Sequence, residues 1–107
     1  MTVLLVSCLK IEDQRRAAQL HQTVRTVCPD TAVQVAWDNS PAHHLGQDIW
    51  QQVSILGFRD MEAAQAFLDS PGYRMVATMR AASGEASVQI VHSALDFDQL
   101  SRQSVNG

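Results

Sequence analysis

Two residues in the second half of the chain, Tyr73 and His92, have side chains that could act together as an acid and a base. Histidine titrates near neutral pH, and a tyrosine hydroxyl can donate a hydrogen bond to a substrate carbonyl. Each residue also has a simpler interpretation. His92 shares a predicted strand face with Val88 and Ile90, where a partner within the protein can satisfy it. The Tyr73 ring can pack across the helix break at Ser70-Pro71-Gly72 with its hydroxyl in water.

A second group of candidates combines aromatic and polar side chains: Trp37, Trp50, Gln52 and Ser54. The last three alternate along one segment, so an extended backbone places them on the same strand face. Polar groups among aromatic rings are typical of a small-molecule pocket, which makes these four residues candidate ligand-binding residues. The same mixture also suits a dimer interface with a few hydrogen bonds. The sequence leaves both interpretations open.

The remaining histidines and the cysteines favour no metal or organic cofactor. His43 and His44 are adjacent in a polar connection, where two neighbours rarely reach one ion, so an exposed loop is expected. His21 is expected on the surface of a helix. Cys8 and Cys28 are too far apart for a zinc ribbon or a CxxC motif, so we expect two small, reduced core residues.

The elements that position these residues follow from hydrophobic periodicity. Apolar residues that alternate or run together predict four strands, and apolar residues at spacings of three and four predict two helices. The second helix restarts at Ser70 and Pro71, which suit an N-cap and a first helical position. The predicted strands are 2–9, 31–37, 49–58 and 87–95. Glu12 and Asp13 open the first helix, and Asp60 is the expected N-cap of the second. A turn is expected at 83–86 and a polar tail from Asp96 onward.

The order β-α-β-β-α-β predicts a ferredoxin-like α+β fold, with an antiparallel sheet and both helices on one face. In the second strand, Val33, Val35 and Trp37 are expected on one face. The strands carry enough apolar side chains for both faces of the sheet, and a second apolar face has to be covered. We therefore expect a homodimer that packs sheet against sheet.

Composition places the chain among ordinary globular domains. It has 107 residues, of which 46% are hydrophobic and 18% charged. The net charge of -3 argues against a nucleic-acid partner, since phosphate binding needs clustered positive charge. No apolar run approaches the roughly 20 residues that span a bilayer, so no membrane partner is expected. The N-terminus lacks the basic start of a signal peptide, which favours the cytoplasm.

One long segment resembles a known family. "NSPAHHLGQDIWQQVSILGFRDMEAAQAFLDSPGYRMV" combines a Ser-Pro connection, a glycine before a strand that ends in Phe, an acidic helix start and an aromatic residue before a second Ser-Pro break. This pattern is similar to stress-responsive α/β-barrel domains of the dimeric α+β barrel superfamily. The resemblance covers about residues 2–98 and implies one domain over 1–98, followed by a polar tail over 99–107.

The resemblance implies a homodimeric barrel, with a cavity between sheet and helices in some members. Members often carry a histidine on the first strand and another after the proline of the break, whereas this chain has Tyr73 at the second position and no histidine on the first strand. The first hypothesis is a binding module for a small hydrophobic or aromatic ligand, with a stress-related role. The alternative is a cofactor-independent cyclase or monooxygenase acting on an aromatic or polyketide-like carbonyl compound through Tyr73 and His92. A heme-handling barrel would need an axial histidine that the pattern does not supply.

Overall fold

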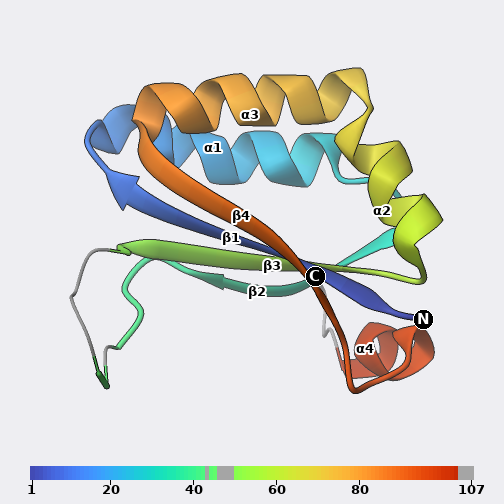
Figure 1. Ribbon diagram of the computed structural model, residues 1–107. Coiled ribbons are helices and arrows are strands. Elements are labelled where there is room, and N and C mark those ends of the chain that lie inside the picture. The colour runs from blue at the N-terminus through green and yellow to red at the C-terminus, as the bar shows by residue number, and fades with distance from the viewer. Residues whose placement is uncertain (43, 46–49, 104–107) are drawn as a thin grey trace.

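The structure, a computed structural model, describes residues 1–42, 44–45 and 50–103 (Figure 1). Within these described residues, four strands and four helices follow one another along the chain. In order they are β1 (Val3–Ile11), α1 (Gln14–Val27), β2 (Ala32–Asp38), β3 (Gln52–Phe58), α2 (Met61–Leu68), α3 (Pro71–Ser83), β4 (Gly84–His92) and α4 (Phe97–Gln103).

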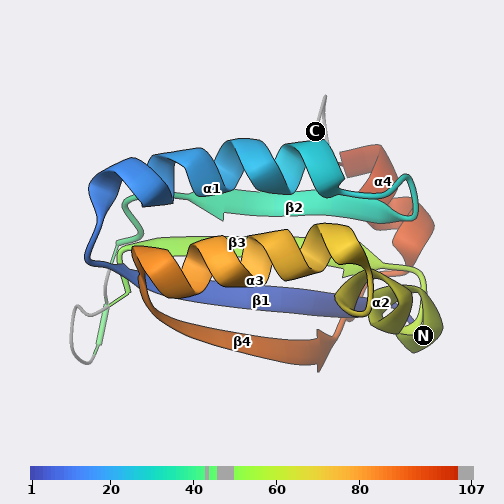
Figure 2. The same cartoon turned by 90° about the horizontal axis from the view of Figure 1, so that it is seen from above.

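The strands form one antiparallel sheet with the order β2-β3-β1-β4. Helices α1 and α3 lie side by side on one face of it, and α4 lies on the other (Figure 1). Seen from above, α1 runs over β2, while β4 lies outside α3 (Figure 2). The predicted ferredoxin-like α+β fold is confirmed. No helix among the described residues is long and apolar enough to cross a membrane.

Side-chain caps start the helices where the sequence predicted. The Asp13 carboxylate accepts the Arg16 backbone N–H at the start of α1, and Asp60 accepts that of Ala63 at the start of α2. The Ser70 hydroxyl accepts the Tyr73 N–H, with Pro71 in the first turn of α3. The break at 69–71 is therefore a structural joint between two helices.

The core lies between the helices and the helix-facing side of the sheet. It is formed by apolar side chains from all three helices on that side and from the two central strands. Its aromatic part links Phe58 of β3 to Phe67 of α2, with ring centroids 5.7 Å apart, and Phe67 to Tyr73, at 5.3 Å. The best-buried members are Val3, Leu5, Leu9, Ala17, Leu20, Val24, Leu56, Phe58, Ala64, Phe67 and Val76.

The predicted face of Trp37 was wrong because β2 contains a bulge. The register shifts between Gln34 and Ala36, so Val33 pairs with Gly57 whereas Trp37 pairs with Ser54. A bulge adds one residue to a strand and reverses the alternation beyond it. Trp37 therefore faces the helices, on the opposite side of the sheet from Val33.

The boundaries of β4 and the start of β3 also differ from the prediction. Strand β4 begins at Gly84, directly after α3, where a turn over 83–86 was expected. The glycine makes this short connection possible, because its φ of 156° is one that other residues rarely adopt. At the other end, β4 stops at His92. Strand β3 is regular only from Gln52, and Ile49 of the predicted strand lies outside the described residues.

The predicted polar tail contains a helix, α4. Asp96 and Gln99 cap it reciprocally: the Gln99 N–H donates to the Asp96 carboxylate, and the Asp96 N–H donates to the Gln99 side-chain oxygen. This is a capping box, a signal that the sequence carries. Leu100 is buried against Gly57 of β3. The expected domain boundary at residue 98 falls within this helix.

The side of the sheet opposite α1 and α3 is called the open face. It is apolar and is formed by Leu4, Val6, Cys8, Val53, Ile55 and Gly57 of the central strands, with Val35 and Val91 at its margins. Helix α4 packs against β2 and β3 there. Leu4, Val6, Cys8, Val53 and Ile55 remain only half-buried.

Candidate functional site

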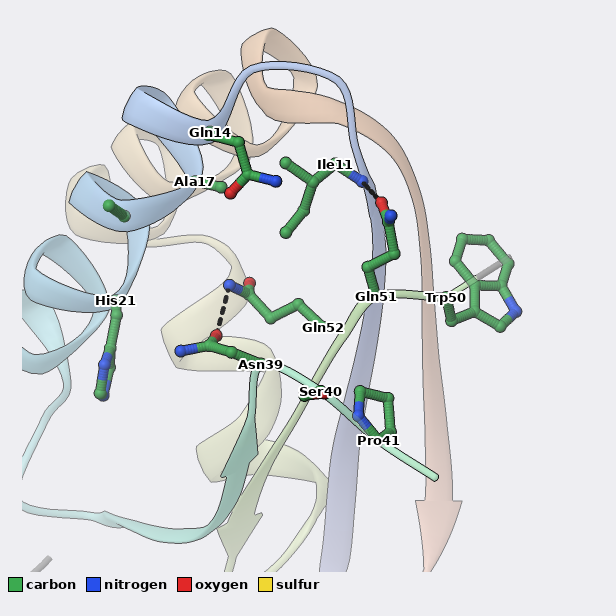
Figure 3. A pocket seen from close by; sticks show the side chains of 11 residues that line it. Ile11, Gln14, Ala17, His21, Asn39, Ser40, Pro41, Trp50, Gln51 and Gln52 are labelled. Atoms are coloured by element: carbon green, nitrogen blue, oxygen red, sulfur yellow. Dashed lines mark hydrogen bonds between the residues drawn. The ribbon is translucent and has the colours of Figure 1, made fainter. Parts of the chain in front are cut away.

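A cleft of about 540 Å³, called the α1–β3 cleft, opens between the first half of α1 and the segments where β2 ends and β3 begins (Figure 3). Most of its polar side chains are carboxamides. It is lined by Ile11, Gln14, Ala17, Ala18, His21, Asn39, Ser40, Pro41, Trp50, Gln51 and Gln52. None of these described residues is an acid, a lysine or an arginine.

Asn39 connects two sides of the cleft. Its side-chain oxygen accepts the indole N–H of Trp37 at 2.9 Å and the side-chain amide of Gln52 at 3.0 Å. Because a carboxamide nitrogen cannot accept these bonds, the two donors fix the orientation of the Asn39 amide. Its Nδ2 group, which has no described partner, then points toward the His21 side of the cleft (Figure 3).

Gln52 presents an acceptor to the same space. Its side chain is 5% exposed, and its nitrogen is engaged by Asn39. Its oxygen has no hydrogen-bond partner among the described residues. Every fully buried side-chain oxygen and nitrogen of the described residues has a hydrogen-bond partner. Because the Gln52 oxygen has none, it is not fully buried and has to be accessible to solvent. Gln52 therefore contributes a mostly buried amide with one accessible acceptor.

Gln51 and Gln14 extend the row of amides. The Gln51 side-chain oxygen accepts the backbone N–H of Ile11 at 2.7 Å, beyond the last residue pair between β1 and β3. This bond leaves the Gln51 amide nitrogen available. Gln14, in the first turn of α1, is exposed and makes no hydrogen bond through its side chain with the described residues. The cleft thus offers fixed donors and one fixed acceptor, with Gln14 free to provide either.

Among the described residues that line the cleft, His21 is the one titratable group. Its ring stacks on Trp37, with centroids 4.1 Å apart and planes inclined by 13°, and its Nε2 lies 3.5 Å from the Gln34 side-chain nitrogen. Burial, and secondly the positive charge of Arg25, lower the pKa of His21 below its ordinary value of 6.5. The imidazole is therefore neutral at pH 7 and can accept a proton.

The structure brings some of the candidate ligand-binding residues of the sequence to this cleft. Trp50 and Gln52 line the cleft, and Trp37 supports it through His21 and Asn39. Ser54 pairs with Trp37 across the sheet. Trp37, Gln52 and Ser54 face the helices, so they do not belong to the open face on which a sheet-to-sheet interface would form. The Trp50 ring is directed away from Gln52 and Asn39 (Figure 3).

Tyr73 and His92 lie outside the α1–β3 cleft, and no described contact joins them. The Tyr73 ring packs edge-on against Phe67, and its hydroxyl accepts a hydrogen bond from Arg80 at 3.2 Å. His92 is exposed at the end of β4. His92 does share a face with Val88 and Ile90, as the strand pairing requires.

The expectation that His21 lies on the surface was wrong. His21 follows Ala17 by four residues and precedes Val24 by three, so it belongs to the stripe of α1 that faces the sheet. That spacing was the signal in the sequence that could have identified it. Asn39 could not be found in this way, since its role depends on the bulge that turns Trp37 toward the helices.

The remaining candidate residues lie elsewhere. His44 is exposed, and His43 lies outside the described residues. The described residues contain no cluster of three metal-binding side chains. Both cysteines are free and half-buried. Burial raises the pKa of the Cys8 thiol, and burial together with Asp30 raises that of Cys28, so both are poor nucleophiles at neutral pH.

A family model described as "Domain of unknown function (DUF1330)" matches residues 2–94, and the chain belongs to this family. No curated protein sequence matches this chain. The resemblance to stress-responsive α/β-barrel domains goes beyond this finding and stays a prediction.

Solved structures share the fold at low sequence identity. A dimeric ferredoxin-like protein of unknown function from Jannaschia sp. CCS1 is 14% identical over 87% of this chain and 100% of its own, with a TM-score of 0.71. An EthD family protein from Bacillus halodurans C-125 is 11% identical over 87% of this chain and 99% of its own, with a TM-score of 0.70. SnoaB, a cofactor-independent oxygenase from Streptomyces nogalater, is 15% identical over 90% of this chain and 96% of its own, with a TM-score of 0.67.

Proposed function

We propose that this member of the DUF1330 family is a binding module for a small, uncharged, planar molecule with a polar edge, which it holds in the α1–β3 cleft. The observation that carries the proposal is the Asn39–Gln52 amide pair. Its internal hydrogen bonds fix both side chains and leave one donor and one acceptor directed into the cleft. Such paired groups suit a carboxamide, a lactam or a hydroxy-carbonyl edge, which offers the complementary acceptor and donor.

The size and composition of the cleft support a ligand of this class. Its volume of about 540 Å³ is within the range of small-molecule sites, roughly 300–1,000 Å³. Ile11 and Ala17 provide apolar surface beside the amides. The described lining carries no formal charge at pH 7, and a charged ligand would lose its hydration without gaining an ion pair. An uncharged ligand is therefore favoured over its anion.

A matched pair of probes tests this proposal. 2-Naphthamide and 2-naphthoate have nearly the same shape, and only the amide is neutral at pH 7. With about 13 heavy atoms at about 0.3 kcal/mol each, the amide should bind with a Kd of about 1 mM. Calorimetric titration should give saturable binding of the amide that is lost in Gln52→Leu and kept in Gln89→Leu, a change on the exposed edge strand. Equal binding to both variants would refute the site.

A second candidate function is proton abstraction from a carbonyl compound without a cofactor. The neutral imidazole of His21 favours it, because the ring lines the cleft beside amide donors that can stabilise an enolate oxygen. SnoaB, which has a similar fold, is described as a cofactor-independent oxygenase. The Tyr73 and His92 pair is the competing assignment for the acid and base of this chemistry.

Hydrogen exchange separates the two assignments. The α-hydrogens of 2-tetralone in deuterated water exchange through an enolate, and a positioned base contributes about 10² to 10⁴-fold to such a step. Under the His21 assignment, His21→Gln lowers the catalysed exchange about 100-fold while His92→Gln leaves it unchanged. Loss of exchange in Tyr73→Phe and His92→Gln, with His21→Gln active, would assign the chemistry to the other pair. No exchange above background leaves binding as the function.

The homodimer is part of the same proposal. The apolar open face supports it, as do the similar structures described as dimeric. A stress-related role, suggested by the family resemblance of the sequence pattern, also stays a prediction. The stress-related role is tested by measuring the abundance of the protein under oxidative, osmotic and thermal stress.

A further inference from the structure

Arg80 is a buried cation on the sheet-facing side of α3. It is 7% exposed, and its guanidinium donates to the Tyr73 hydroxyl at 3.2 Å and to the Ser7 hydroxyl at 3.4 Å. The guanidinium carbon also lies 5.8 Å from the centre of the Tyr73 ring. These three side chains come from the start and the end of α3 and from the middle of β1.

No acid compensates this charge among the described residues. The ion pairs found there are those of Arg16 with Asp13 and of Arg59 with Asp98, both exposed. A guanidinium has five N–H donors and stays charged at every physiological pH. Two neutral hydroxyls, one of them at a long distance, use two of those donors. Burial of a cation with neutral partners alone is costly, and charged side chains are almost never fully buried unless they are paired.

An exposed apolar surface lies beside Arg80. Strand β4 is outside α3, and none of the described helices covers it (Figure 2). Val88 of β4 pairs with Ser7 and Ile90 pairs with Leu5, so both side chains are on the same face of the sheet as Ser7 and the guanidinium. Val88 is 39% and Ile90 37% exposed. We call Val88 and Ile90 the β4 shelf.

We propose that Arg80, Tyr73 and Ser7 form a second ligand site, which binds the carboxylate of a small amphiphilic acid whose apolar body lies on the β4 shelf. The carboxylate would take the unused N–H groups of Arg80 in a charge-assisted, two-point contact. Val88 and Ile90 would lose their contact with water. The site is separate from the α1–β3 cleft, because it lies beneath α3 and none of its residues lines that cleft.

A purely structural role for Arg80 makes different predictions. In that case the arginine would act as a scaffold between α3 and β1, and its replacement by a long apolar side chain would weaken packing without affecting any ligand. A ligand role predicts that Arg80→Met folds with a melting temperature equal to or above that of the wild type, since the unpaired charge is removed.

The matched probes used for the cleft also test this site. 2-Naphthoate should bind saturably to the wild-type protein and to Gln52→Leu, and at least tenfold more weakly to Arg80→Met. Val88→Glu places a negative charge on the exposed shelf and should weaken 2-naphthoate binding to the same extent, which keeps the test valid if Arg80→Met fails to fold. 2-Naphthamide binding should be unchanged in Val88→Glu.

Three results would overturn the proposal. The first is the absence of 2-naphthoate binding, and the second is binding that persists in both Arg80→Met and Val88→Glu. The third is binding lost only in Gln52→Leu, which would place the acid in the cleft. If 2-naphthoate does not bind and native mass spectrometry shows that Arg80→Met dissociates a dimer, the carboxylate comes from a second copy of the chain. None of these outcomes depends on whether 2-naphthamide binds in the cleft.

Discussion

Replacement of Asn39 by alanine should remove the hydrogen bonds that connect two sides of the α1–β3 cleft and lower the free energy of unfolding measurably. The change removes the acceptor of two hydrogen bonds, from Trp37 at 2.9 Å and from Gln52 at 3.0 Å. The two donors differ in their surroundings. Trp37 is half-buried and water can replace part of its bond, whereas Gln52 is 5% exposed and its amide nitrogen would be left largely without a partner.

The magnitude follows from that difference. A lost neutral hydrogen bond costs about 0.5–1.5 kcal/mol, and a buried group left without a partner costs about 1–3 kcal/mol. For an exposed asparagine joined to one buried donor, we expect a loss of about 2 kcal/mol. In a domain of this size each kcal/mol lowers the melting temperature by about 4 °C, so the expected shift is about 8 °C. Asn39→Asp keeps both acceptor contacts and should lose less than about 1 kcal/mol.

Urea unfolding measures these free energies in Asn39→Ala, in Asn39→Asp, in Gln52→Leu and in the double variant Asn39→Ala with Gln52→Leu. With leucine at position 52 there is no buried amide to leave unpaired, so Asn39→Ala should then cost only about 0.5 kcal/mol. The resulting coupling energy is about 1.5 kcal/mol, well above the error of additivity at independent sites. The hydrogen bonds of Asn39 would be refuted if Asn39→Ala and Asn39→Asp lost equal free energy of unfolding, or if the effects of changes at positions 39 and 52 were additive.

Three further predictions concern the rest of the structure. Gly72→Ala should lower the melting temperature by about 5 °C, because the added Cβ would lie 2.8 Å from the Cβ of Val27; an unchanged melting temperature would contradict this close approach of α3 to α1. Stability should fall as the pH drops from 7 to 5, because the lowered pKa of His21 means that the unfolded chain binds a proton the folded chain does not, and His21→Gln should flatten this slope in thermal melts at successive pH values. Ile55→Glu on the open face should give a monomer by native mass spectrometry at tens of micromolar, and a dimer that survives this charge would place the interface elsewhere.

The fold could be predicted because each element has a local cause in the sequence. Asp13, Asp60 and Ser70 cap helices through side-chain bonds between near neighbours, and the apolar spacing of α1 depends on a helical period alone. Such signals depend on a few adjacent residues. The capping box of α4, formed by Asp96 and Gln99, is equally local, but the segment is polar and lacks the apolar spacing that marks α1 as a helix.

The cleft could be predicted only in part, since it depends on one irregularity in β2. Regular alternation places Trp37 with Val33, away from the helices; the bulge between Gln34 and Ala36 reverses this. Only after that reversal can the indole stack on His21 and donate to Asn39. A bulge shows no reliable mark in a single sequence, so residues as far apart as 21, 37 and 52 could not be grouped before the register was known.

The two proposed sites differ in charge because different helices cover them. The first half of α1 presents Gln14, Ala17 and His21 to the start of β3, where amides and a neutral imidazole define an uncharged space. Helix α3 presents Arg80 to β1, next to a strand that no described helix covers. A neutral ligand in the first site gains directed hydrogen bonds at little desolvation cost, whereas an acid in the second compensates a charge already removed from water. We therefore expect the α1–β3 cleft to prefer the amide and the Arg80 site to prefer the carboxylate. One pair of isosteric probes can test both assignments in a single protein.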